Sequence, residues 1–146
     1  TAGDAVSDNA TTATAATFTL APMAADLGMG GIIHSVTLHK SDQDLTAADF
    51  DIYFFRVQPV GTGYEDNVAI AITDAEWQEC VGCVSLTGSA NGVSVATGDL
   101  YCKTNLDLPY DCVKGSQSLY FVMVARGTYT PADGETFTLT VGGQVE

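Results

Sequence analysis

Four cysteines are the residues of this 146-residue chain whose type and spacing most directly suggest chemistry. Cys80 and Cys83 form a C-x2-C motif three residues after the only tryptophan, and Cys102 and Cys112 follow further along the chain. A C-x2-C motif can be a redox centre, half of a zinc site or part of a disulfide framework. The three chemistries require different surroundings, so the local sequence helps to discriminate between them.

The sequence around the C-x2-C motif disfavours redox and zinc chemistry. A redox pair lies at the N-terminus of a helix, where the helix dipole stabilises a thiolate. Here a predicted helix precedes the motif and a strand follows it. A zinc ribbon needs a second closely spaced pair, whereas Cys102 and Cys112 form a C-x9-C pattern. We therefore predict disulfides among the four cysteines, with free buried thiols as the alternative.

The sequence leaves the disulfide connectivity open, because four cysteines allow three pairings. Cys102 and Cys112 bracket a segment with Pro109 that could return on itself. Cys80 and Cys83 can bridge only if the chain turns between them, which Gly82 would permit. Persistent disulfides would imply an oxidising compartment or an extracellular particle.

The other polar residues form no coherent catalytic or metal-binding set. His34 and His39 lie five residues apart on a predicted strand, so they point to opposite faces and are interpreted as structural histidines. No G-x-S-x-G motif is present. Two groups of loop acids do not follow the EF-hand pattern, although weak calcium binding stays open: Asp42, Asp44, Asp49 and Asp51, and Asn105, Asp107 and Asp111. We predict a protein that is not an enzyme, with no cofactor.

The elements that would position these residues are strands almost throughout. Alternating or β-branched runs separated by Gly, Pro and Asn are typical of strands. In the second run, Ile32, His34, Val36 and Leu38 share the more apolar face. The predicted strands cover residues 11–22, 30–40, 50–59, 81–88, 92–98, 99–103, 117–127 and 135–143.

One short helix is predicted over residues 72–80, because Thr73 and Glu76 have the spacing of a capping box. Seven or eight short strands favour an all-β fold, an antiparallel β-sandwich of jelly-roll type. We expect residues 1–12 to form a flexible N-terminal arm and residues 13–146 to form a single domain. The first twenty residues lack the basic start and apolar core of a signal peptide.

Charge narrows the range of partners. Five Lys and Arg against eighteen Asp and Glu give a formal net charge of −13. Such a chain repels nucleic acid and anionic membrane surfaces, so neither is an expected partner. The acidity keeps the protein soluble, or it complements a basic partner protein.

Three stretches of the chain resemble a group of small virion proteins of tailed bacteriophages. They are "GGIIHSVTLHKSDQDLTAADFDIYFFRVQP" (30–59), "YEDNVAIAITDAEWQECVGCVSL" (64–86) and "SLYFVMVARGTYTPADGETFTLTVG" (118–142). The group shows the patterns I-x-S-V-x-L, D-I-Y-F-F, D-N-x-A-x-x-I-x-D-A-E and L-Y-x-V-x-V-A-R-G-T-x-T in this order. Members of the group tend to have Val, Gly or Leu at the positions of the four cysteines. This departure suggests disulfides that were added to the shared fold.

The resemblance implies a structural subunit on the exterior of the phage head. It would be a decoration or cement protein that binds neighbouring major capsid proteins, as a homo-oligomer for which a trimer is favoured. Arg56 and Arg126, the only arginines, end aromatic-rich strands and are candidate interface anchors, with salt bridges at the strand ends as the alternative. A carbohydrate-binding or receptor-binding module of a tail fibre is the alternative function.

Overall fold

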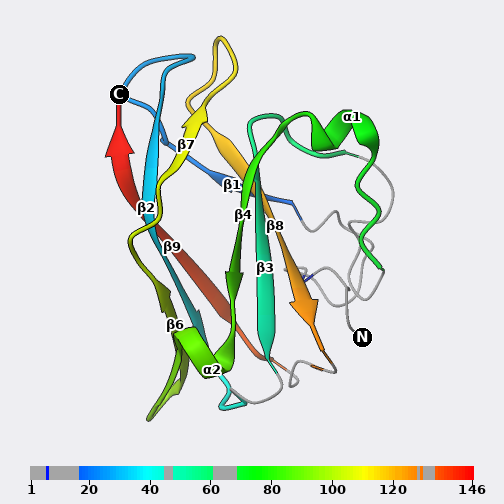
Figure 1. Ribbon diagram of the computed structural model, residues 1–146, viewed down its shortest axis with the longest axis vertical. Helices are drawn as coiled ribbons and strands as arrows, with labels where there is room; N and C mark the ends of the chain where they lie inside the picture. The colour runs from blue at the N-terminus through cyan, green and yellow to red at the C-terminus, as the bar shows by residue number, and fades with distance from the viewer. Residues whose placement is uncertain (1–5, 7–16, 45–47, 61–68, 128, 130–133) are drawn as a thin grey trace.

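The computed structural model describes residue 6 and residues 17–44, 48–60, 69–127, 129 and 134–146. Within this part of the chain, nine strands form two antiparallel sheets (Figure 1). The predicted all-β class is thereby confirmed. The predicted N-terminal arm over residues 1–12 lies outside the described residues except for Val6. The Val6 side chain is buried in the core, and its N–H donates to the Met123 carbonyl oxygen at 2.9 Å.

The first sheet has four strands in the order β1-β8-β3-β4. Its central strands, β8 and β3, are rich in aromatic and β-branched residues that pack well on a pleated surface. Each neighbouring pair is antiparallel. The strands are β1 (Phe18–Leu20), β3 (Asp49–Phe55), β4 (Cys80–Leu86) and β8 (Leu119–Arg126).

The second sheet has five strands built around β2, the longest strand. Along one side, β2 pairs with β9 over nearly its whole length. Along the other side, it pairs first with β7 and then with β6, which lie end to end. The outermost strand, β5, pairs with β6. The strands are β2 (Gly30–Lys40), β5 (Gly92–Val95), β6 (Gly98–Lys103), β7 (Leu108–Asp111) and β9 (Phe137–Val145).

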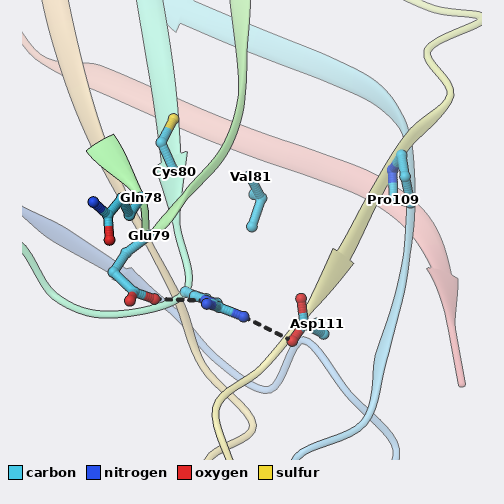
Figure 2. A pocket seen from close by; sticks show the side chains of 7 residues that line it. Gln78, Glu79, Cys80, Val81, Pro109 and Asp111 are labelled. Carbon is cyan, nitrogen blue, oxygen red and sulfur yellow. Dashed lines mark hydrogen bonds and ion pairs between the residues drawn. The ribbon is translucent and has the colours of Figure 1, made fainter. Parts of the chain in front are cut away.

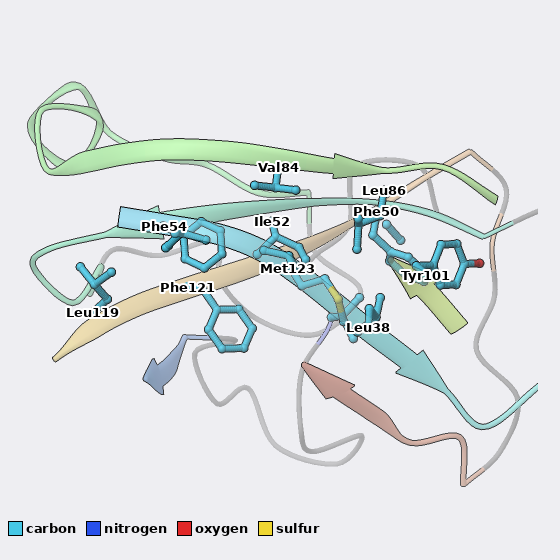
Figure 3. Packing of buried hydrophobic residues seen from close by; sticks show 14 of the residues in the cluster. Leu38, Phe50, Ile52, Phe54, Val84, Leu86, Tyr101, Leu119, Phe121 and Met123 are labelled. Carbon is cyan, nitrogen blue, oxygen red and sulfur yellow. The ribbon is translucent and has the colours of Figure 1, made fainter. Parts of the chain in front are cut away.

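One hydrophobic core contains side chains from both sheets (Figure 3). Phe50 of β3 is fully buried at its centre and makes edge-to-face contacts with Tyr101 of β6 and Phe137 of β9, with both pairs of ring centroids 5.7 Å apart. A second, smaller cluster on the other face of the first sheet contains Phe55, Val122 and Val124. The alternation of β3 therefore buries apolar side chains on both of its faces.

The core also contains a buried ionic network at the end of β2. Lys40 is fully buried, and its Nζ lies 2.8 Å from Oε1 of Glu135 and 3.8 Å from Oδ2 of Asp99, whose side chains are also buried. The Lys40 ammonium lies 5.1 Å from the ring centre of Tyr129, which donates its hydroxyl to Glu135. Ser94 Oγ donates to Asp99 at 2.7 Å. Burial, together with the Glu135 carboxylate, raises the pKa of Tyr129 far above its usual range.

A β-bulge in β2 corrects the predicted facing of its side chains. The pairing with β9 shifts register between Ile33 and Ser35, which inserts His34 as an extra residue. Ile33 is buried together with Val36 and Leu38, whereas His34 is exposed. The prediction that His34 shares the apolar face with Val36 and Leu38 was wrong, because the bulge changes the alternation at that residue.

Two short helices are present among the described residues, one more than predicted. α1 (Asp74–Trp77) has the expected capping box: the Thr73 side chain accepts from the Glu76 N–H, and the Glu76 side chain accepts from the Thr73 N–H. α2 (Gly88–Asn91) follows β4, and its N-cap residue, Thr87, makes no side-chain capping hydrogen bond. No described helix is long and apolar enough to cross a membrane.

Candidate functional site

A polar cluster lies on the face of the first sheet that points away from the main core. Asp51 and Tyr53 are two residues apart on β3, and Ser85 of β4 lies directly opposite Asp51. The largely buried Asp51 carboxylate forms an ion pair with Arg126 and accepts a hydrogen bond from Ser85 Oγ at 2.6 Å. Tyr53 donates to Asp51 at 3.4 Å and accepts from Arg126 at 3.5 Å. We call these four residues the Asp51 cluster.

Helix α1 places the only tryptophan beside the Asp51 cluster. The Trp77 ring packs edge-to-face on the Tyr53 ring, with centroids 5.4 Å apart and an interplanar angle of 75°. The Trp77 side chain stays 45% exposed. Burial is the main cause that raises the pKa of Tyr53, and the Cys83 thiol and Asp51 carboxylate add to it, so its hydroxyl stays protonated at neutral pH. An exposed aromatic ring therefore adjoins hydrogen-bonding groups held in a fixed geometry.

A second arginine lies in a small polar cleft between the end of β3, the start of β4 and β7 (Figure 2). Arg56 Nε lies 2.5 Å from Oε2 of Glu79, and its Nη1 lies 3.3 Å from Oδ2 of Asp111. The cleft has a volume of about 280 Å³, and Gln78, Cys80, Val81 and Pro109 complete its lining. Arg56 thus joins the α1–β4 junction to β7.

Both predicted interface residues, Arg56 and Arg126, are held in ion pairs within the chain. Their side chains keep 37% and 56% of their surface exposed, respectively. This is the salt-bridge alternative that their positions at strand ends suggested. Because an exposed arginine can exchange partners at a modest cost, contact with another protein stays a prediction for both residues.

All four cysteines are free thiols in the structure. Cys102 of β6 lies opposite Thr37 of β2, whereas the N–H of Cys112 donates to the carbonyl oxygen of Met29. Eight residues of strand separate Thr37 from Met29, a distance of about 26 Å, and a disulfide needs Cα atoms within about 7 Å. The segment between Cys102 and Cys112 does not return on itself, because β6 and β7 run along β2 one after the other.

The C-x2-C motif lies inside a strand rather than on a turn. Gly82 belongs to β4, so the turn that a bond between Cys80 and Cys83 requires is absent. A register shift places Cys80 opposite Phe55 and Cys83 opposite Tyr53, which puts both thiols on one face. Desolvation, with the Asp51 carboxylate adding to it, raises the pKa of Cys83 to about 11.

Burial also raises the pKa of Cys80. The thiolate form that redox and metal chemistry require is therefore disfavoured at both thiols of the motif. Disulfides between the C-x2-C segment and Cys102 or Cys112 stay a prediction.

Three of the acidic residues considered for calcium are used in internal contacts. Asp49 accepts from the Gly88 N–H at 2.8 Å, Asp51 belongs to its cluster, and Asp111 pairs with Arg56. In the described part of the chain, no group of three or more His, Cys, Asp or Glu side chains could hold a metal ion.

The contact of Trp77 with Tyr53 was not predicted from the sequence. A usable signal was present: Asp51 and Tyr53 alternate with the apolar Phe50, Ile52 and Phe54. Such a pattern places a polar residue and an aromatic residue together on the opposite face of the sheet.

The geometry defines an all-β protein of two antiparallel sheets, in which both arginines are ion-paired at the ends of β3 and β8. No family model, curated protein or solved structure matches the chain.

Proposed function

We propose that the protein is a non-enzymatic virion structural protein. It acts as a decoration or cement subunit on the exterior of a phage head, where it binds and stabilises neighbouring major capsid proteins. The observation that carries the proposal is the resemblance of residues 30–142 to small virion proteins of tailed phages. The ion pairs within the chain support this proposal. They use the charged groups of Arg56, Arg126 and Asp51 to hold the fold together rather than for catalysis.

The fold that suits this function is a jelly-roll-like β-sandwich. Its support is the chain path: five of the eight connections between successive strands pass from one sheet to the other, namely β1–β2, β2–β3, β4–β5, β7–β8 and β8–β9. Frequent crossing between two sheets is typical of Greek-key and jelly-roll sandwiches. The shared core around Phe50 provides the packing between the sheets.

Charge supports a basic partner. The formal net charge is −13, and both arginines are paired with carboxylates of the same chain. Exposed acids therefore dominate the surface that is open to a partner, and a basic rim on the capsid would complement them. Electrostatic complementarity of this kind accelerates association and makes it sensitive to salt.

Binding to empty capsids assembled from a major capsid protein of a tailed phage tests the proposal. The purified protein should co-sediment with empty capsids and raise their resistance to heat and low salt. A triple variant, Asp26→Asn, Asp74→Asn and Asp107→Asn, removes three exposed charges and should associate several-fold more slowly. The same three positions changed to Glu keep the charge and serve as the control. Capsids equally robust with and without the protein would contradict the proposal.

A specific observation favours a second candidate, a carbohydrate-binding or receptor-binding module of a tail fibre. Trp77 offers an exposed ring beside the Asp51 cluster, and sugar-binding sites combine an aromatic face with a few fixed polar groups. Under this function, the protein binds specific glycans on an array, and Trp77→Ala abolishes that binding while Val60→Ala, at another exposed apolar residue, retains it. A wild-type protein that binds no glycan would rule this candidate out.

A further inference from the structure

Within the described part of the chain, the edge that β9 forms on the five-stranded sheet lacks protective features that the other edges have. β9 pairs with β2 along one side, and no described strand pairs with its other side. Its nine residues, FTLTVGGQV, contain no charged residue and no proline. Natural proteins usually shorten such an edge or block it with Lys or Pro, since free N–H and C=O groups recruit another strand.

The remaining edges carry these protective features. β1 has three residues and is followed by Pro22, and β5 has four residues. β7 contains Pro109 and the charged Asp111. At β4, Lys103 donates from the opposite sheet to the Ser85 carbonyl oxygen at 3.1 Å. The lack of any such feature on the longest edge is therefore specific to β9.

An apolar groove of about 350 Å³ lies next to this edge, between β9 and the strands β1 and β8. Phe137 and Leu139 of β9 form one wall, and Phe18, Leu20 and Phe121 form part of the opposite wall. A strand added to β9 would place every second side chain on the groove side of the sheet. The edge thus offers both main-chain hydrogen bonds and an apolar surface, as in recognition by strand addition.

We propose that β9 pairs antiparallel with β9 of a second copy of this chain, about a two-fold axis, to give a dimer with one continuous sheet. Charge argues for this occupant. Two copies that each carry −13 repel one another over most of their surface, so they can meet closely only where the surface is uncharged. A basic partner would instead be attracted to the acidic surface elsewhere.

The sequence of β9 is also complementary to itself. Phe137, Leu139 and Val141 alternate with the exposed Thr138 and Thr140. When a strand pairs antiparallel with its own copy about an axis through a residue, odd-numbered residues face odd-numbered residues. Apolar side chains then meet apolar side chains above the groove, and threonines meet threonines on the outer face, which is a favourable cross-strand pair. The isologous interface closes at two subunits.

The mass of the wild-type protein in solution, measured by light scattering or sedimentation over a range of concentrations, tests this proposal. We expect the mass of two chains. Thr140→Asp introduces a like charge into the paired strand of each copy and should weaken the dimer several-fold. Val93→Asp, at an exposed position on the opposite edge of the same sheet, adds the same charge and should leave the dimer intact. Circular dichroism verifies that each variant is folded.

Hydrogen exchange of the wild-type protein provides a second readout that does not depend on the variants. Amides in residues 137–145 should exchange more slowly as the concentration rises, while those of β5 should not change. A monomer at every concentration would overturn the proposal, as would the trimer that the resemblance implies. Equal dissociation of the Thr140→Asp and Val93→Asp variants would overturn it as well. These outcomes do not depend on capsid binding, so the proposed function is tested separately.

Discussion

Replacing Lys40 with methionine lowers the free energy of unfolding by about 3–5 kcal/mol, the cost typical of removing one partner from a buried ion pair. The substitution keeps most of the side-chain length but removes the ammonium that pairs with the buried carboxylates of Asp99 and Glu135. The loss arises from uncompensated buried charge rather than from lost packing. Denaturant unfolding monitored by fluorescence measures the change.

Lys114→Met is the matched control, because it removes the same charge from an exposed side chain. Its effect should stay within about 0.5 kcal/mol. Adding Glu135→Gln to Lys40→Met removes one of the two carboxylates that face the lost ammonium, so it should recover part of the lost stability, since the two residues belong to one network. Equal stability of the Lys40→Met and Lys114→Met variants would show that the ionic network contributes nothing.

Replacing Phe50 with alanine costs about 3–5 kcal/mol, the range for removing a buried aromatic side chain from a well-packed core. Phe50 is fully buried and makes edge-to-face contacts with three rings, those of Tyr101, Tyr129 and Phe137. Tyr101 and Phe137 belong to the opposite sheet, so the cavity would open between the two sheets. Thermal and denaturant unfolding report the loss.

Two further variants separate the causes of this loss. Phe50→Leu retains much of the volume but removes the ring contacts, each worth about 0.5–1.5 kcal/mol beyond burial, so it should fall between wild type and Phe50→Ala. Val60→Ala, at a side chain that is 81% exposed, should have almost no effect. A Phe50→Ala variant as stable as Val60→Ala would mean that the sheets do not pack through this residue.

Local sequence signals predicted the features of the fold that depend on neighbouring residues. The alternating run over residues 30–40 coincides with β2, and the spacing of Thr73 and Glu76 identified the cap of α1. Two antiparallel sheets followed from the number of short strands. These features arise from periodicity and capping, which a single stretch of chain contains in full.

Features that depend on distant partners could not be predicted in the same way. Lysine is almost never fully buried unless it is paired, and the partner of Lys40 lies 95 residues away, at Glu135. The bulge at His34 exists only in the pairing of β2 with β9. A loop between Cys102 and Cys112 could bring the two thiols together, as far as the local sequence shows. Their actual distance depends on the parts of β2 with which β6 and β7 pair.

The pairing of β2 with β9 has a consequence for the order of events during synthesis. β2 is the second strand to leave the ribosome, and β9, which pairs with nearly all of it, is the last of the nine. The five-stranded sheet cannot be completed while the chain grows, and one side of β2 stays unpaired until β9 emerges. Contacts between segments so distant in sequence also slow folding. The growing chain therefore carries an unpaired apolar strand until β9 has emerged, and chaperone binding would protect that strand during this interval.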